Sequence, residues 1–184
     1  MRLIILDRDG VINEDSDAYI KSPAEWVPIP GSLEAIARLN HEGWRVVISS
    51  NQSGLARGLF DIDTLMRIHE KMQRAVAQLG GAIDAVFFCP HGPEDHCHCR
   101  KPKPGLLEDI AARLRVDLRG VPAVGDSRRD IDSAMQVGAL PILVRTGKGQ
   151  QTIAQGTGLL DVPVFDDLAA VVDALLAGEL AGVA

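Results

Sequence analysis

The sequence predicts an α/β protein whose core is a doubly wound parallel sheet. Short apolar segments alternate along the chain with segments of helical periodicity. The apolar segments are hydrophobic throughout, which is typical of strands that are buried on both faces of a sheet. Helices between such strands cover both faces of a parallel sheet, so the two observations together favour this fold class.

Five segments fit buried strands. They comprise residues 3–6, 44–49, 83–88, 121–124 and 140–144. The last segment contains Pro141 near its start, where a missing backbone N–H disturbs a sheet least.

Five other segments fit helices. The first is expected to have Ser32 as its N-cap and to end at Gly43, because these residue types are favoured at those positions. The second, residues 61–79, places apolar residues such as Leu65 and Ile68 on one face, as in an amphipathic helix. The remaining helices are predicted over residues 106–114, 130–137 and 168–176.

Length and charge limit the protein class. A chain of 184 residues suits one domain with its own core, and we predict a single domain over residues 1–184 with a frayed tail at 178–184. The net charge of −6 disfavours general nucleic-acid binding, which needs a positive surface. No segment approaches the ~20 apolar residues of a membrane span, and the N-terminal apolar run is too short for a signal peptide. We expect a cytoplasmic monomer without nucleic-acid or membrane partners.

Polar clusters follow four of the predicted strands directly. They lie at residues 7–13 (DRDGVIN), 49–54 (SSNQSG), 89–91 (CPH) and 125–130 (GDSRRD). In doubly wound sheets the ligand site lies outside the carboxyl ends of the strands, so these clusters predict a single site there.

Two of the clusters predict a magnesium site. Asp7 and Asp9 are two residues apart, so in extended backbone their side chains point to the same side and repel each other. Mg²⁺ prefers oxygen ligands and takes one or two carboxylates plus a substrate phosphate, and Asp126 can supply the other carboxylate. The alternative is that Asp7 and Asp9 only cap a loop.

A cluster of cysteine and histidine predicts a structural zinc site. Three thiols and one imidazole form a closed tetrahedral donor set, as structural Zn²⁺ prefers: Cys89, His91, Cys97 and Cys99. His96 and His98 are close enough in sequence to replace His91. The alternative is a loop of reduced cysteines with surface histidines.

The motifs at residues 7–13, 50–54, 100–105 (RKPKPG) and 125–130 resemble those of the haloacid-dehalogenase-like phosphatases. More narrowly, residues 3–147 are similar to the D-glycero-D-manno-heptose 1,7-bisphosphate 7-phosphatases. The resemblance implies a Rossmann-like fold and Mg²⁺-dependent hydrolysis of the 7-phosphate of a small sugar bisphosphate through an aspartyl-phosphate intermediate. It also implies a place in the synthesis of nucleotide-activated heptose for the lipopolysaccharide core.

The resemblance also implies catalytic roles. Asp7 matches the nucleophile, and Asp9 matches the general acid and base, which requires a proton on Asp9 at the start. Ser50 and Lys101 match the residues that stabilise the phosphoryl group, with Lys103 as a competitor for Lys101. Mg²⁺ is expected on the Asp7 carboxylate, the Asp9 carbonyl and the Asp126 carboxylate. Asp130 either orients this site from behind or serves only as a helix N-cap.

Further residues are predicted to bind the substrate. These are Asp15, Tyr19, Asn51, Gln52, Ser53, Arg100 and Arg128. Arg128 has the equally plausible alternative of a solvated helix start. The zinc loop, residues 89–99, is predicted to aim Arg100 and Lys101 at the site.

The gaps between the predicted strands leave no room for a large cap domain. Three other functions stay open: a histidinol-phosphate phosphatase, whose N-terminal domain is similar; a receiver domain that only accepts a phosphoryl group; and a zinc-dependent nucleic-acid module. The receiver needs no proton donor two residues after its nucleophile, and the third lacks aromatic side chains near the cysteines.

Overall fold

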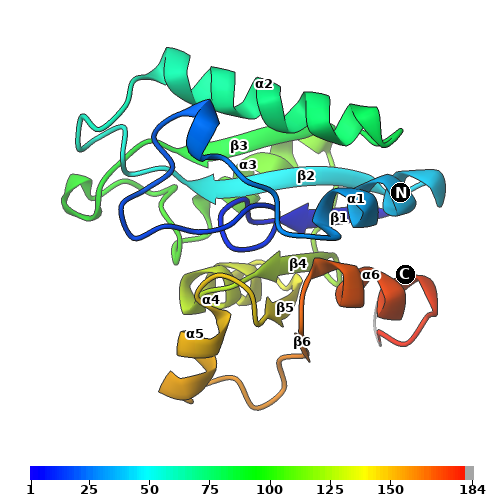
Figure 1. Cartoon of the computed structure of the whole chain (residues 1–184). Helices are drawn as coiled ribbons and strands as arrows, with labels where there is room; N and C mark the ends of the chain where they lie inside the picture. The colour runs from blue at the N-terminus through cyan, green and yellow to red at the C-terminus, as the bar shows by residue number, and fades with distance from the viewer. Residues whose placement is uncertain (181–184) are drawn as a thin grey trace.

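The computed structural model describes residues 1–180; the end of the tail predicted to be frayed, residues 181–184, lies outside the described residues. Six parallel strands form one sheet in the order β3-β2-β1-β4-β5-β6 (Figure 1). The strands are β1 Leu3–Leu6, β2 Arg45–Asn51, β3 Ala85–Cys89, β4 Pro122–Gly125, β5 Leu140–Val144 and β6 Val164–Phe165.

Helices connect the strands and cover the sheet. They are α1 Ser32–His41, α2 Ile62–Gln78, α3 Gly105–Leu114, α4 Arg128–Gln136, α5 Gly149–Gln155 and α6 Leu168–Leu176, with short 3₁₀ turns at Pro23–Glu25 and Pro93–Asp95. The predicted α/β class with a doubly wound parallel sheet is therefore confirmed.

The apolar strands supply two cores, one on each face of the sheet. In β1, Ile4 and Leu6 belong to the core under α1, α2 and α6, whereas Leu3 and Ile5 belong to the core under α3 and α4. All four side chains are at most 2% exposed. Side chains alternate between the faces of a strand, so a strand that is apolar throughout needs helices on both sides.

The sequence located five strands and five helices and missed two elements. Strand β6 has only two residues, and α5 (GQQTIAQ) lacks a clear apolar face. Ser32 as the N-cap of α1 was wrong. The N-cap is Gly31, whose φ of 84° lies in the left-handed region, and the Ser32 hydroxyl donates instead to the Val11 carbonyl at 2.9 Å.

The sheet topology fixes the position of the site. The chain leaves β1 toward β2 on one side and later returns to β4 on the other, so the carboxyl end of β1 is the switch point of the sheet. The arrowheads of β1, β2 and β4 meet the same loop-rich edge in Figure 1. Within residues 1–180, the connections after β1 and β2 carry one α-helix each and no cap domain, as predicted. No helix in this range is both long and apolar enough to cross a membrane.

Candidate active site

A cavity of about 320 Å³ opens at the carboxyl ends of β1, β2 and β4. Most of the predicted site residues line it: Asp7, Asp9, Asp15, Tyr19, Asn51, Ser53, Arg100, Lys101 and Asp126. These residues come from segments more than 100 positions apart in the sequence. The prediction of one site outside the strand ends therefore agrees with the structure.

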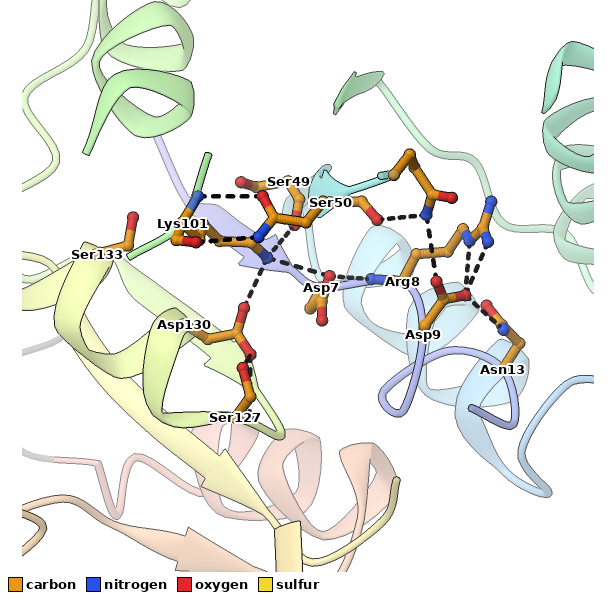
Figure 2. Close-up of polar contacts among 12 residues, drawn as sticks. Asp7, Arg8, Asp9, Asn13, Ser49, Ser50, Lys101, Ser127, Asp130 and Ser133 are labelled. Carbon is orange, nitrogen blue, oxygen red and sulfur yellow. Dashed lines mark hydrogen bonds and ion pairs between the residues drawn. The ribbon is translucent and has the colours of Figure 1, made fainter. Parts of the chain in front are cut away.

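Lys101 is the buried cation at the floor of this cavity (Figure 2). Its Nζ donates to Asp7 Oδ1 at 3.1 Å, to Asp130 Oδ1 at 2.6 Å and to the Ser49 carbonyl at 2.8 Å. Burial opposes the charge, but the Asp130 and Asp7 carboxylates outweigh it and raise the pKa of Lys101. The ammonium is therefore held as a fixed positive charge next to Asp7.

Two neighbours place Lys101. The Asn51 side chain accepts from the Lys101 backbone N–H and donates to its carbonyl, both at 3.1 Å. Asp130 is fixed in turn by Ser127 in a capping box at the start of α4, with hydrogen bonds of 3.0 and 2.6 Å. The alternative that Asp130 is the N-cap of the helix was wrong, because Ser127 is the N-cap and Asp130 is the N3 residue of the capping box. Its contact with Lys101 agrees with an orienting role. The competitor Lys103 bonds the Cys97 carbonyl at 2.5 Å instead.

Two carboxyls face the cavity with too little positive charge nearby to balance them: Asp126, which is buried, and Asp7, which is 13% exposed. Burial, helped by the carboxylates of Asp130 and Asp9, raises the pKa of Asp7 to about 7 although Lys101 opposes the shift. Burial and the nearby Asp130 and Asp7 raise the pKa of Asp126 to about 8. Such a pair is stabilised in the ionised form by a divalent cation.

The donor chemistry fits a hard cation such as Mg²⁺. Asp7, Asp126 and Asp130 can bring carboxylate oxygens within 4.8 Å of one another. Both oxygens of Asp130 are already bonded to Lys101 and Ser127, so Asp7 and Asp126 are the better ligands. A Cβ at Gly10 or Gly147 would collide with the Asp126 carboxylate, and these glycines thus leave room for it.

Asp9 receives several hydrogen bonds (Figure 2). Its Oδ1 accepts from Arg8 Nε and Asn13 Nδ2, both at 2.9 Å, and its Oδ2 accepts from Gln52 Nε2 at 3.2 Å. Gln52 also donates to the Ser50 hydroxyl at 2.8 Å. Ser50 and Gln52 are buried and are not among the residues that line the cavity, and Gln52 connects Ser50 to Asp9.

Several cations surround the mouth of the cavity. Arg57 lies over the Tyr19 ring, 5.8 Å from its centroid, and both residues line the cavity. Arg128 does not line it; its guanidinium bonds Asp132 and the Thr157 carbonyl. The next residue, Arg129, lines it instead. The contribution of Arg128 to substrate binding remains a prediction without a supporting contact.

Three cations on the cavity wall were not predicted from the sequence: Arg57, Arg129 and Lys148. The backbone N–H of Lys148 donates to Asp126 at 2.7 Å, and its Nζ lies 3.4 Å from the Asp15 carboxylate. Lys148 follows β5. The polar residues after that strand were the sequence signal that could have indicated it.

The predicted zinc ligands converge at the loop after β3. Cys89 Sγ lies 3.1 Å from Cys99 Sγ and 3.7 Å from Cys97 Sγ. His91 Nδ1 lies 3.5 Å from the Cys89 sulfur and 3.4 Å from the Cys99 sulfur. Four donors around Zn²⁺, with Zn–S bonds near 2.3 Å, are separated by about 3.8 Å. His91 rather than His96 or His98 completes this set.

Two family descriptions match the chain. The HAD-hydrolase-like family matches residues 98–171, and the polynucleotide kinase 3 phosphatase family matches residues 2–131. The D-glycero-beta-D-manno-heptose-1,7-bisphosphate 7-phosphatase of Bordetella bronchiseptica is 62% identical over 96% of this chain and 98% of its own length. The protein of the same name from Pseudomonas putida is 52% identical over 96% of this chain and 100% of its own length.

Solved structures agree with these relatives. The D,D-heptose 1,7-bisphosphate phosphatase of B. bronchiseptica, complexed with magnesium and phosphate, has a TM-score of 0.95 at 61% identity, covering 97% of this chain and 99% of that one. The phosphatase of the same name from Burkholderia thailandensis has a TM-score of 0.77 at 47% identity, covering 96% and 99%. The chain therefore belongs to the HAD-like phosphatases and, within them, to the D-glycero-D-manno-heptose 1,7-bisphosphate 7-phosphatase family.

Proposed function

We propose that this protein is a Mg²⁺-dependent phosphatase that hydrolyses the 7-phosphate of D-glycero-D-manno-heptose 1,7-bisphosphate, during the synthesis of nucleotide-activated heptose for the lipopolysaccharide core. One observation carries the proposal: Lys101 Nζ lies 3.1 Å from Asp7 Oδ1 at the floor of a cavity that Asp9 and Asp126 also line. Similarity to relatives that carry this name supports the substrate. The cytoplasm, where thiols stay reduced, suits the cysteine cluster.

In the first half of the reaction, an Asp7 oxygen attacks the phosphorus and the sugar oxygen leaves with a proton from Asp9. Attack by an anion on an anion needs compensating charge, which Lys101 supplies as a preorganised cation. The Ser53 hydroxyl and Arg100 line the same cavity and are placed to contact the phosphoryl oxygens or the sugar.

In the second half, Asp9 accepts a proton from the water that hydrolyses the aspartyl phosphate, and Asp7 is regenerated. Asp7 and Asp126, together with the Asp9 carbonyl, would hold Mg²⁺. Bound there, Mg²⁺ supplies charge that offsets the developing negative charge of the phosphoryl group.

The cavity mouth suits a substrate with a second anionic group. Three cationic side chains line the cavity in addition to Lys101 and Lys148: Arg57, Arg100 and Arg129. Asp15, Ser16 and Asp17 also line the cavity and offer acceptors for sugar hydroxyls. The additional cations can hold the second phosphate of a bisphosphorylated sugar, a group that histidinol phosphate lacks.

The cysteine cluster is proposed to hold a structural zinc ion. Four ligands close the coordination sphere, so the ion takes no part in the chemistry. Cys99 directly precedes Arg100 and Lys101, and zinc therefore braces the segment that carries both cations. His91 is the imidazole ligand that the distances support.

A panel of phosphate esters tests the proposed function. Purified protein is incubated with both anomers of the heptose bisphosphate, histidinol phosphate and a 3′-phosphorylated oligonucleotide, with Mg²⁺ or with EDTA. The oligonucleotide is included because a polynucleotide phosphatase family matches residues 2–131. Fast Mg²⁺-dependent phosphate release from a heptose bisphosphate and little from the others is the expected result.

Asp7→Asn and Asp9→Asn are the matched variants, and both should abolish turnover. Retained activity in Asp7→Asn would contradict the covalent mechanism. A receiver domain would instead show a phosphorylated Asp7 that survives for minutes without further turnover. Preference for histidinol phosphate would move the assignment to the related family.

A further inference from the structure

Arg8 is a buried guanidinium that the reaction described above does not use. It lies between Asp7 and Asp9, and its side chain is 0% exposed. A buried charge is costly unless it is paired and hydrogen-bonded, so the partners of Arg8 indicate why it is there.

On one side, Arg8 holds a single oxygen of Asp9. Its Nε donates to Asp9 Oδ1 at 2.9 Å, and its Nη2 lies 2.8 Å from the same oxygen. Asn13 Nδ2 donates to Oδ1 as well, at 2.9 Å. Figure 2 shows Arg8 and Asn13 meeting the Asp9 carboxylate together.

The other oxygen of Asp9 has a different environment. Among residues 1–180, Oδ2 accepts one side-chain hydrogen bond, from Gln52 Nε2 at the longer distance of 3.2 Å. Oδ1 accepts two hydrogen bonds, from Arg8 Nε and Asn13 Nδ2, and has Arg8 Nη2 close beside it, so it has less room for a proton of its own than Oδ2. The two oxygens of Asp9 are therefore inequivalent before any substrate binds.

On its other side, Arg8 is anchored to helix α2. Arg8 Nη1 lies 3.2 Å from Nε2 of His69, which is 5% exposed. The His69 ring packs edge-on against Phe88, with the ring centroids 6.1 Å apart. A guanidinium only donates, so Nε2 accepts and His69 is the neutral imidazole. The imidazole thus fixes the guanidinium from a helix 61 residues away along the chain.

We propose that Arg8, held by His69, is a positioning residue that fixes Asp9 so that Oδ2 is the oxygen that exchanges the proton. This inference rests on the proposed function. In the first step the Oδ2–H bond breaks as the leaving sugar oxygen takes the proton, while the P–O bond breaks and the Asp7–phosphorus bond forms. In the second step a water oxygen bonds to phosphorus, its proton passes to Oδ2, and the Asp7–phosphorus bond breaks.

The choice of leaving group tests this role. A sugar oxygen must be protonated as it leaves, whereas p-nitrophenolate leaves without a proton. The variants are Arg8→Lys, which keeps the charge but loses the planar fork, His69→Leu, which removes the acceptor, and His69→Gln, which retains one. Single-turnover rates are measured with the heptose bisphosphate and with p-nitrophenyl phosphate, together with kcat and KM.

With the sugar ester, we expect the single-turnover rate to fall about 100-fold in Arg8→Lys and about 10-fold in His69→Leu, since positioned proton transfer contributes about 10²–10⁴-fold. His69→Gln should stay within about 3-fold of the wild type. Release of p-nitrophenol and the KM for the sugar should change less than about 3-fold in all three variants. Equal losses on both esters, or no loss on the sugar ester, would overturn the proposal.

Exposed residues provide matched controls. Arg67→Lys and His41→Leu should behave as wild type, because both side chains are exposed and lie away from Asp9. If Arg8→Lys does not fold, as judged by circular dichroism, the His69→Leu and His69→Gln pair decides the question. A wild type that is inactive on the heptose bisphosphate but cleaves another alkyl phosphate refutes the proposed substrate, and the same comparison then uses that ester.

Discussion

His69 should make the stability of the protein depend on pH. Burial, together with the Arg8 charge, lowers the pKa of His69 from 6.5 to about 4. The unfolded chain therefore binds a proton between these values that the folded chain does not, and stability is lost as pH falls from about 7 to 4. The loss from this group is on the order of 3 kcal/mol.

The measurement is the free energy of unfolding in urea at several pH values for wild type, His69→Gln and the exposed control His41→Gln. The His69→Gln variant should lose less stability between pH 7 and 4 than the other two proteins. Parallel curves for all three would show that the imidazole is not kept neutral in the folded state.

Replacing Gly10 by alanine, with Gly43 as the control, distinguishes the effect of backbone strain from the effect of crowding at Asp126. Its φ is 85°, and an added Cβ would collide with the Asp126 carboxylate. Gly43 has a similar φ of 78° with nothing within 4 Å of an added Cβ, so it is the matched control. Both Gly→Ala variants should lose about 1–2 kcal/mol of stability from the left-handed backbone. Only Gly10→Ala should also lose Mg²⁺-dependent activity. Equal activity in the two variants would contradict the close fit around Asp126.

Single residues were predictable from the sequence where a motif spacing fixes them to a strand end. Asp7 and Asp126 were identified this way, whereas Lys101 was identified from the resemblance of the RKPKPG motif, and all three line the cavity. His69 and Arg129 were not, because His69 lies within an amphipathic helix and Arg129 at an ordinary helix start. The contacts of His69 with Arg8 and Phe88, and the place of Arg129 on the cavity wall, arise only in the folded chain.

At the scale of elements, the loop after β3 should depend on zinc while the sheet does not. Removal of zinc by a chelator, or Cys97→Ser, is expected to raise the KM and speed hydrogen exchange over residues 89–104. The strands, which have their own apolar cores, should keep their protection. His96→Ala is the control, because His91 completes the ligand set. Unchanged kinetics in zinc-free protein would contradict a bracing role.

Elements with a strong apolar pattern were predictable, and short ones were not. Segments 140–144 and 168–176 match β5 and α6 in the structure. The pair α5 and β6 was missed because its apolar residues pack in a small core of their own with Ile131 and Leu143, separate from the two main cores. This core depends on tertiary contacts. The sequence pattern of an element of two residues carries too little information to distinguish it from a loop.

At the scale of the whole molecule, Mg²⁺ should stabilise the fold more at high pH. The raised pKa values of Asp7 and Asp126, about 7 and 8, mean that the metal-free folded chain binds more protons than the unfolded chain above pH 4. Without metal, stability therefore falls as pH rises toward 8. Mg²⁺ is expected to bind the ionised carboxylates, so the stabilisation that it supplies should grow over the same pH range and reach about 2.7 kcal/mol at a concentration 100 times its Kd.

Thermal unfolding with and without Mg²⁺ at pH 6.0 and 8.5 measures this effect. The rise in Tm should be larger at pH 8.5 in the wild type and should largely vanish in Asp126→Asn. An equal rise at both pH values would show that the metal does not compete with protons at these carboxyls.

The absence of a cap domain in residues 1–180 has a consequence for what limits turnover. Enzymes that enclose their substrate commonly wait for a lid to reopen before product departs. Because no domain covers the cavity in these residues, reopening of a cap domain should not delay departure of the alcohol and the phosphate. Added glycerol or sucrose raises the viscosity and slows the motion of a cap domain. It should therefore leave kcat unchanged relative to a control solution of equal water activity.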